Sequence, residues 1–367
     1  MLTTRFRHGA VLLAAVLSVV LAVASQLHAT AELPARLSDQ EFWDLTEALS
    51  EDNGYFRSDN FLSNETGYQG VIPDLVERVK PGGVYMGVAP EINFTYIAAL
   101  KPRMAFIVDI RRGNLHEHLL YKALFEMSAN RGEFLSKLFS REKPASLTAT
   151  ATIEEMFAAY NKVQASEALY QENLKAVMDW LTKRHEFKLR PQDPEGIEYV
   201  YKEAFFRGGP YLNYSFGSGG FGGGNSPTYE QLMLTHDGTG KNRSFLATEE
   251  NFAWVKEFET RNLLVPVVGD FAGAKAIRGV AKYVRDHGAT VGAFYLSNVE
   301  QYLTGPLWPS FCANAATLPL DDTSTYIFSG RGPQNGSVGF PGGGRVGGMG
   351  NSRTRPMLSE VKACAEK

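Results

Sequence analysis

The sequence predicts an α/β fold, with a mostly parallel sheet, helices on both of its faces and a helical insertion. Three observations predict it. Short apolar runs alternate with helical periodicity from Val84 to about Phe125, and the same alternation returns from Thr248 to Phe328. The stretch between these two regions has helical spacing of its apolar residues. Parallel strands need crossover connections, usually helices, so a repeated strand–helix order indicates a parallel sheet.

The N-terminal segment, residues 1–31, is a predicted signal peptide or N-terminal anchor. Arg5 and Arg7 precede an apolar run at residues 10–24, and Ala29-Thr30-Ala31 is the small-x-small pattern that signal peptidase accepts. The apolar run is short for a membrane span, which needs about 20 residues. We therefore favour cleavage after this triplet over a retained anchor. The protein is then exported, to the periplasm or the outer face of the inner membrane, and touches the membrane only through this segment if it is uncleaved.

Composition excludes several classes of protein. The 367 residues are 44% hydrophobic and 21% charged, which is ordinary for a globular protein, and the formal net charge is -3. Binding of nucleic acid needs a basic surface, so we expect no nucleic-acid partner. The two cysteines, Cys312 and Cys364, form neither a disulfide framework nor a thiolate metal cluster. Because Cys364 falls in a predicted tail, the sequence favours two free thiols over a bridge.

The first half of the sheet is predicted between Ser38 and about Phe125. Ser38 and Glu41 have the spacing of a capping box, and apolar residues share one face of the helix that follows. Two apolar runs read as buried strands because each is short and bounded by turn residues. The predicted elements are helices at 38–49, 72–79, 93–100 and about 115–125, and strands at 84–88 and 104–108.

An insertion separates the two halves. Apolar residues from Ile153 to Leu181 recur at three- and four-residue spacing, which predicts one long helical stretch whose aromatic stripe packs in a core. A further helix is predicted at 197–206, and residues 217–224 are nearly all glycine, which predicts a flexible loop. We therefore expect a single domain at residues 32–329, with a helical and Gly-rich insertion at about 130–246.

The second half resumes the strand–helix order. Thr248 is a suitable N-cap, and Glu249 and Glu250 suit the positive end of the helix it begins. The predicted elements are helices at 248–260 and 274–287, strands at 263–268 and 290–296, and an edge strand at 324–328. Residues 330–367 are rich in Gly, Pro, Ser and Arg over most of their length, so we predict a disordered tail.

Polar or glycine-rich residues follow four of the predicted strands. Ligands of open α/β sheets bind at the carboxyl ends of strands. Those ends carry residues 87–91, Asp109, Asp270 and residues 297–300. Asp109 lies 22 positions after Gly87, and an acidic residue about 20 positions after a glycine turn holds a ribose hydroxyl in dinucleotide-binding folds. The sequence therefore predicts a site for a small-molecule ligand of nucleoside type.

These segments resemble a known family. Val84-Tyr85-Met86-Gly87-Val88-Ala89-Pro90-Glu91 is similar to the first motif of class I S-adenosylmethionine-dependent methyltransferases, which have a Rossmann-like sheet, and Asp109 resembles their ribose-binding acid. Val268-Gly269-Asp270-Phe271 resembles their adenine-side acidic motif, and residues 294–300 resemble the strand whose end faces the reacting methyl group. The resemblance covers roughly residues 71–125 and 247–328.

The resemblance implies a transferase of a methyl or related group, with S-adenosylmethionine as cofactor and no metal. Catalysis would then depend on positioning, because a sulfonium is already a good donor. The implied cofactor-binding residues are Gly87, Glu91, Asp109 and Asp270, and the residues implied to orient the acceptor are Asn298, Glu300 and Tyr96. The segments Asn93-Phe94-Thr95-Tyr96 and Ser297-Asn298-Val299-Glu300 also resemble an uncharacterised bacterial exported family, which brings no activity.

Three departures from the motif favour a second interpretation. Tyr85 stands where the family has an acidic residue, and Ala89 and Glu91 stand where it has glycines. A side chain in either place narrows the room for a ligand against the backbone, although a buried Glu91 could act as a general base. The alternative is a non-catalytic exported binding or scaffold protein that retains the fold.

Each candidate residue also has a structural interpretation. Asp109 would cap the following helix or pair with Arg111 or Arg112, Asp270 would cap the helix near Ala274, and Asn298 and Glu300 would be surface groups. The histidines of His116-Glu117-His118 are two positions apart and do not share a helix face, so a metal pair is not expected. The sequence shows no nucleophile–base pair of the kind that a hydrolase needs, so it does not favour a hydrolase.

Overall fold

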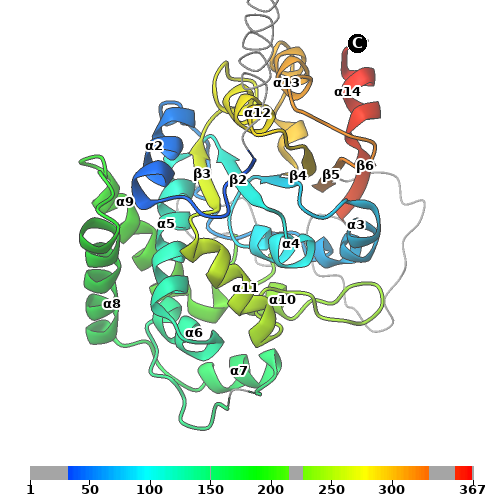
Figure 1. The fold of residues 1–367 in the computed structure, drawn as a ribbon. Helices are drawn as coiled ribbons and strands as arrows, with labels where there is room; N and C mark the ends of the chain where they lie inside the picture. Colours follow the sequence, from blue (N-terminus) through cyan, green and yellow to red (C-terminus); the bar gives the residue numbers. More distant parts are fainter. Residues whose placement is uncertain (1–31, 149, 215–225, 330–351, 366–367) are drawn as a thin grey trace, which may run out of the picture.

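A six-stranded sheet organises the computed structural model, which describes residues 32–148, 150–214, 226–329 and 352–365. The strand order is β3-β2-β1-β4-β5-β6, and all neighbouring strands are parallel except β5 and β6 (Figure 1). The predicted α/β fold is confirmed. The strands are β1 (Val84–Gly87), β2 (Met104–Asp109), β3 (Leu264–Val268), β4 (Val291–Ser297), β5 (Thr325–Ser329) and β6 (Ser352–Pro356).

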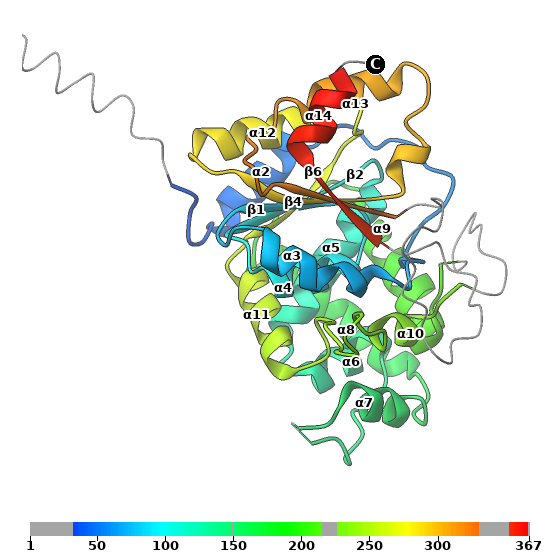
Figure 2. The same cartoon turned by 90° about the vertical axis from the view of Figure 1, so that its right-hand side faces the viewer.

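Helices cover both faces of the sheet (Figure 2). On one face lie α2 (Asp39–Leu49), α12 (Ala276–Asp286), α13 (Leu307–Ala315) and α14 (Met357–Ala365). On the other lie α3 (Ile72–Arg78), α4 (Ile92–Leu100), α5 (Arg112–Met127) and α11 (Glu249–Thr260). Strands covered on both faces are mainly apolar, and β1, β2 and β3 are buried at every residue.

The helix starts predicted from Ser38 and Thr248 are confirmed. The Ser38 hydroxyl accepts a hydrogen bond from Glu41 N at 3.2 Å, and Glu41 Oε2 accepts one from Ser38 N at 2.8 Å, which completes the capping box of α2. Thr248 Oγ1 accepts from Asn251 N at 3.1 Å and begins α11. These side chains satisfy backbone N–H groups that a helix leaves unpaired at its first turn.

The insertion packs against α5 and extends away from the sheet (Figure 1). Its helices are α6 (Arg131–Phe139), α7 (Ile153–Tyr160), α8 (Glu167–Asp179), α9 (Asp193–Val200) and α10 (Tyr229–Met233). The prediction of one long helix from Ile153 to Leu181 is wrong. The chain leaves the helix after Tyr160, and the Ser166 side chain accepts from Leu169 N to begin a second helix. The predicted glycine loop at 217–224 lies outside the described residues.

Five shorter helical turns complete the described chain. They are η1 (Tyr68–Val71), η2 (Trp180–Arg184), η3 (Tyr201–Phe206), η4 (Gly209–Tyr211) and η5 (Val299–Gln301). The predicted helix at 197–206 is therefore divided between α9 and η3, whose hydrogen bonds follow the wider π pattern.

The prediction of a disordered tail is wrong for residues 352–365. Strand β6 pairs with the open edge of β5, and α14 follows it. Cys364 on α14 forms a disulfide with Cys312 on α13, with the two Cα atoms 5.6 Å apart, so the expectation of two free thiols is also wrong. Without β6, the outer edge of β5 would leave backbone N–H and C=O groups unpaired, and β6 forms hydrogen bonds with that edge. Residues 330–351 lie outside the described residues.

The disulfide is consistent with export, because disulfides persist in oxidising compartments. Within the described ranges, no helix combines the length and the apolar character that crossing a bilayer requires. The predicted signal segment, residues 1–31, is not among the residues described.

Candidate functional site

A cleft of about 270 Å³ opens at the carboxyl ends of the parallel strands. We call it the switch-point cleft, because the strand order reverses between β1 and β4 and open α/β sheets bind ligands at such a point. Four strand ends and two loops contribute its wall. The lining residues with polar or aromatic side chains are Tyr55, Phe56, Asn60, Asp109, Arg111, Asp270, Phe271, Ser297, Asn298 and Tyr302.

The two central strands both end in a left-handed residue that is not glycine. Ala89, just after β1, has φ +64°, and Ser297, at the end of β4, has φ +52°. This region is unfavourable for residues with a Cβ, and such strain is found mainly where the surrounding structure enforces it. His118 Nε2 lies 3.2 Å from the Ala89 carbonyl, and the Ser297 hydroxyl donates to Glu65. Both strained turns line the cleft.

Gly87 makes room for a side chain of the protein itself. A Cβ at this position would lie 2.0 Å from Asn93 Oδ1. The Asn93 amide donates to the carbonyls of Val88, Ala89 and Pro90 at 2.8–2.9 Å, and its Oδ1 accepts from the Tyr85 hydroxyl at 2.8 Å. The glycine therefore serves the shape of the β1 turn, and Gly87 is not among the residues that line the cleft.

Asp109 faces the cleft but is paired with Arg111. The guanidinium donates to both carboxylate oxygens, at 3.0 and 2.8 Å, and Arg111 N donates to Oδ1 at 2.9 Å. A carboxylate offers about four acceptor positions, so roughly one is left for a ligand. The structural interpretation of Asp109, pairing with Arg111, is thus what the structure shows.

Asp270 lies in the cleft without capping α12. Its Oδ1 accepts from Ala272 N at 2.9 Å, which closes a local turn. The cap of α12 is instead Glu51, whose carboxylate accepts from Lys275 N and Ala276 N at 3.0 and 2.9 Å. A carboxylate is favourable there because the helix N-terminus is positive. Asp270 can therefore present its second oxygen to a ligand.

Glu91 and Tyr96 are buried away from the cleft. Both oxygens of Glu91 lie within 3.3 Å of Ser63 N, and burial raises the pKa of this fully buried carboxyl to about 8. The Tyr96 hydroxyl donates to the carbonyl of Tyr68 at 2.9 Å. Neither side chain lines the cleft.

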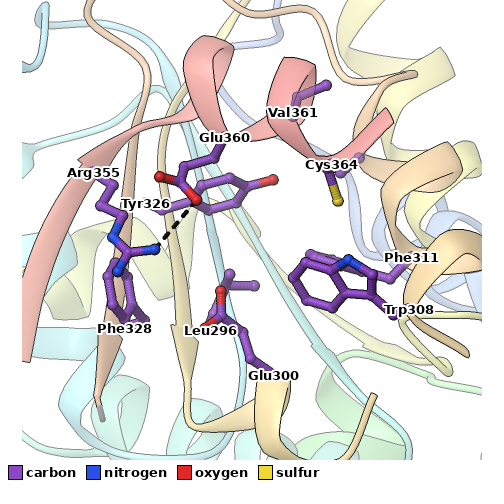
Figure 3. A pocket seen from close by; sticks show the side chains of 11 residues that line it. Leu296, Glu300, Trp308, Phe311, Tyr326, Phe328, Arg355, Glu360, Val361 and Cys364 are labelled. Carbon is purple, nitrogen blue, oxygen red and sulfur yellow. Dashed lines mark hydrogen bonds and ion pairs between the residues drawn. The ribbon is translucent and has the colours of Figure 1, made fainter. Parts of the chain in front are cut away.

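Glu300 faces a different cavity, shown in Figure 3. This cavity lies between β4, β5 and the C-terminal α14, and its volume of about 20 Å³ suffices for about one water. Arg355 lines one side of it, forms an ion pair with Glu360 at 3.3 Å, and lies over the Phe328 ring at 4.5 Å. Of the seven predicted site residues, the structure thus brings Asp109, Asp270 and Asn298 together in the switch-point cleft.

An aromatic wall is the part of the cleft that sequence reasoning missed. Tyr55 is 86% exposed, and Phe56 packs edge-on against Tyr302 with ring centroids 5.1 Å apart. These rings come from loops more than 200 residues apart in the chain, so no local pattern joins them. An apolar wall with a few polar groups is typical of small-molecule sites.

The charges of the cleft restrict its ligand. Its described lining has two carboxylates, one guanidinium and no lysine or histidine. A phosphorylated ligand would meet net negative charge, whereas a cationic or neutral ligand with an aromatic ring would be favoured. No group of three or more His, Cys, Asp or Glu side chains among the described residues is arranged to hold a metal ion.

Comparison with known proteins shows a family but no activity. A domain of unknown function, DUF7790, matches at residues 60–202 and 226–337. The interruption of this match includes the glycine-rich stretch. A search of curated proteins gives no match. The matched residues make up more than half of the chain and include the four strand ends that form the cleft, so this protein belongs to the DUF7790 family.

Proposed function

We propose that the switch-point cleft binds S-adenosylmethionine, and that the protein is a transferase of a methyl or related group in the bacterial cell envelope. The observation that supports this most is the open cleft at the sheet's switch point, where Asp109, Asp270 and Asn298 meet an aromatic wall. Tyr85 and Glu91 depart from the methyltransferase motif, but their side chains do not fill the cleft.

Each part of the ligand has a matching part of the cleft. The aromatic wall suits the adenine ring, and the carboxylates of Asp109 and Asp270 suit hydroxyl and amino donors. The net negative charge of the lining suits a cationic sulfonium. The cofactor supplies an electrophilic methyl group, and the protein's contribution is to hold donor and acceptor in line and exclude water.

A non-catalytic binding protein is the second candidate, and the Asp109–Arg111 pair favours it. This pair occupies both oxygens of the carboxylate that the resemblance assigns to ribose. The same cleft would then bind a nucleoside without transferring a group. Binding without turnover distinguishes this candidate from the first.

Isothermal titration of residues 32–367 with S-adenosylmethionine tests the proposal. We expect saturable binding, weakened about tenfold or more in Asp270→Asn, since the loss of a charge-assisted hydrogen bond costs about 1.5–3 kcal/mol. The exposed Glu154→Gln, on α7 of the insertion, is the matched control and should bind as the wild type does. No heat at millimolar ligand would refute the proposal.

A further inference from the structure

A second cavity, of about 340 Å³, adjoins the switch-point cleft. The two share Tyr55, Phe56 and Arg111 in their walls, so they meet at these residues. The far wall of the second cavity comes from α5 and from α9 of the insertion, and includes Gly113, His116, Gly196 and Tyr199. We call it the insertion-side cavity.

A histidine paired with a buried carboxylate lies in this wall. His116 Nε2 is 2.8 Å from Asp193 Oδ1, and Asp193 is fully buried. Arg112 donates to both oxygens of Asp193, at 2.6 and 2.8 Å, and Arg190 N donates to Oδ2 at 2.7 Å. Burial alone would raise the pKa of Asp193, but the hydrogen bonds from Arg112 and His116 outweigh it and hold this pKa well below its ordinary value.

The ionised Asp193 fixes the tautomer of His116. A carboxylate can only accept, so Nε2 of the neutral ring carries the proton and Nδ1 has a lone pair. Nδ1 makes no hydrogen bond with any residue in the described ranges. A Cβ at position 196 would lie 2.2 Å from both Nδ1 and Cε1, so α9 packs closely against this edge of the ring and only glycine fits there.

We propose that the insertion-side cavity binds the acceptor and that His116 is its general base, with Asp193 as a positioning residue. This rests on the proposed function for the identity of the donor. The acceptor is a small protic nucleophile, and the aromatic side chains of Tyr55, Phe61 and Tyr199 in the wall favour a phenol.

The step balances without another reactant. The phenol oxygen forms a bond to the methyl carbon while the carbon–sulfur bond breaks, and sulfur keeps the bonding pair to become a neutral thioether. The phenolic proton passes to His116 Nδ1, and Asp193 stabilises the imidazolium that results. Proton removal by such a base contributes about 10²–10⁴-fold to rate.

Labelling with diethyl pyrocarbonate tests the base independently of any donor. In a protein that spans residues 32–367, we expect the reagent to carbethoxylate His116 as well as the exposed His236. His185 is the matched control: it is equally buried, at 7% exposure, but both of its ring nitrogens are bonded, to Asp39 and Glu126. 4-Nitrophenol should protect His116 and leave His236 reactive. An unreactive His116, or no protection by the phenol, would overturn the proposal.

Two further measurements test the roles of the neighbours. Gly196→Ala should slow the labelling of His116, because a methyl that would lie 2.2 Å from Nδ1 must displace the ring or α9 and crowd this nitrogen. Ring-¹⁵N-labelled protein should show the Nε2–H tautomer of neutral His116, whereas the Nδ1–H tautomer would contradict the positioning role of Asp193.

Transfer from labelled S-adenosylmethionine to a panel of phenols and catechols tests the reaction. His116→Gln should lower transfer about 100-fold or more while leaving the affinity for S-adenosylmethionine unchanged. Wild-type transfer rates in this variant would overturn the assignment of the base. If the wild type does not bind the donor, the proposed function fails, and labelling with its phenol protection still decides the assignment of the cavity.

Discussion

Buried carboxyl groups shape the site at the scale of single residues. Glu65, Glu91 and Glu117 are each at most 1% exposed, and burial raises the pKa of all three. A neutral carboxylic acid avoids most of the cost of burying a charge. The Glu91 carboxyl therefore accepts a hydrogen bond from Ser63 N and does not line the switch-point cleft. The sequence could not predict this, because burial of Glu91 depends on a loop 28 residues away.

The raised pKa of Glu91 predicts a loss of stability toward alkaline pH. The pKa of Glu91 in the folded protein is about 8, above the ordinary 4.5. Between these two pH values the folded state keeps a proton that the unfolded state has already lost. The free energy of unfolding then falls by about 1.4 kcal/mol per pH unit in this window. Glu259 has a similar shift, so Glu91→Gln should make the decline shallower without abolishing it. Urea unfolding from pH 5 to 8 measures this, and an unchanged slope would contradict it.

Gly87 predicts a second residue-scale effect. Gly87→Ala would press on Asn93, which holds three carbonyls of the β1 turn, and should lower the free energy of unfolding by about 2–3 kcal/mol. Gly113→Ala on α5 meets no atom within 4 Å and should be neutral or slightly stabilising. Chemical denaturation compares the two. Equal effects would show that Asn93 does not depend on the glycine.

At the scale of elements, the sequence predicts those that have local signals but not those that depend on long-range pairing. Strands β1 to β5 and helices α2 and α11 follow from apolar runs and caps that lie within a few residues. Strand β6 has no such signal: Ser-Arg-Thr-Arg-Pro lacks apolar alternation, and it forms because β5 offers an open edge. Helix α14 is then held by a disulfide to a residue 52 positions away.

Reduction of Cys312–Cys364 should destabilise the protein. Removing a bridge across this separation costs about 2–4 kcal/mol by the entropy of the unfolded chain. We expect a lower midpoint of thermal unfolding in dithiothreitol, and the same midpoint in the Cys312→Ser, Cys364→Ser double variant with or without reductant. If the midpoint of thermal unfolding of the wild type is the same with and without dithiothreitol, a structural role for the bridge is contradicted.

At the scale of the whole molecule, the strand order explains which site residues could be predicted. The carboxyl ends of parallel strands share one edge of the sheet, so Asp109, Asp270 and Asn298 converge although they are far apart in sequence. The rule did not hold for every candidate. Tyr96 lies on α4 and bonds to the carbonyl of Tyr68, and Glu300, three residues after the end of β4, lines the smaller cavity beside α14. The His116–Asp193 pair joins helices 77 residues apart and gives no sequence signal.

Ultraviolet cross-linking of radiolabelled S-adenosylmethionine to residues 32–367 tests the central claim most directly. In the proposed complex the aromatic wall of the switch-point cleft lies against the ligand, so peptide mapping should find the label on the segment with Tyr55 and Phe56 or on the one with Tyr302. Excess unlabelled S-adenosylhomocysteine should compete for this labelling. Labelling that is absent from both segments, or that the competitor does not reduce, would contradict the assignment of this cleft as the ligand site.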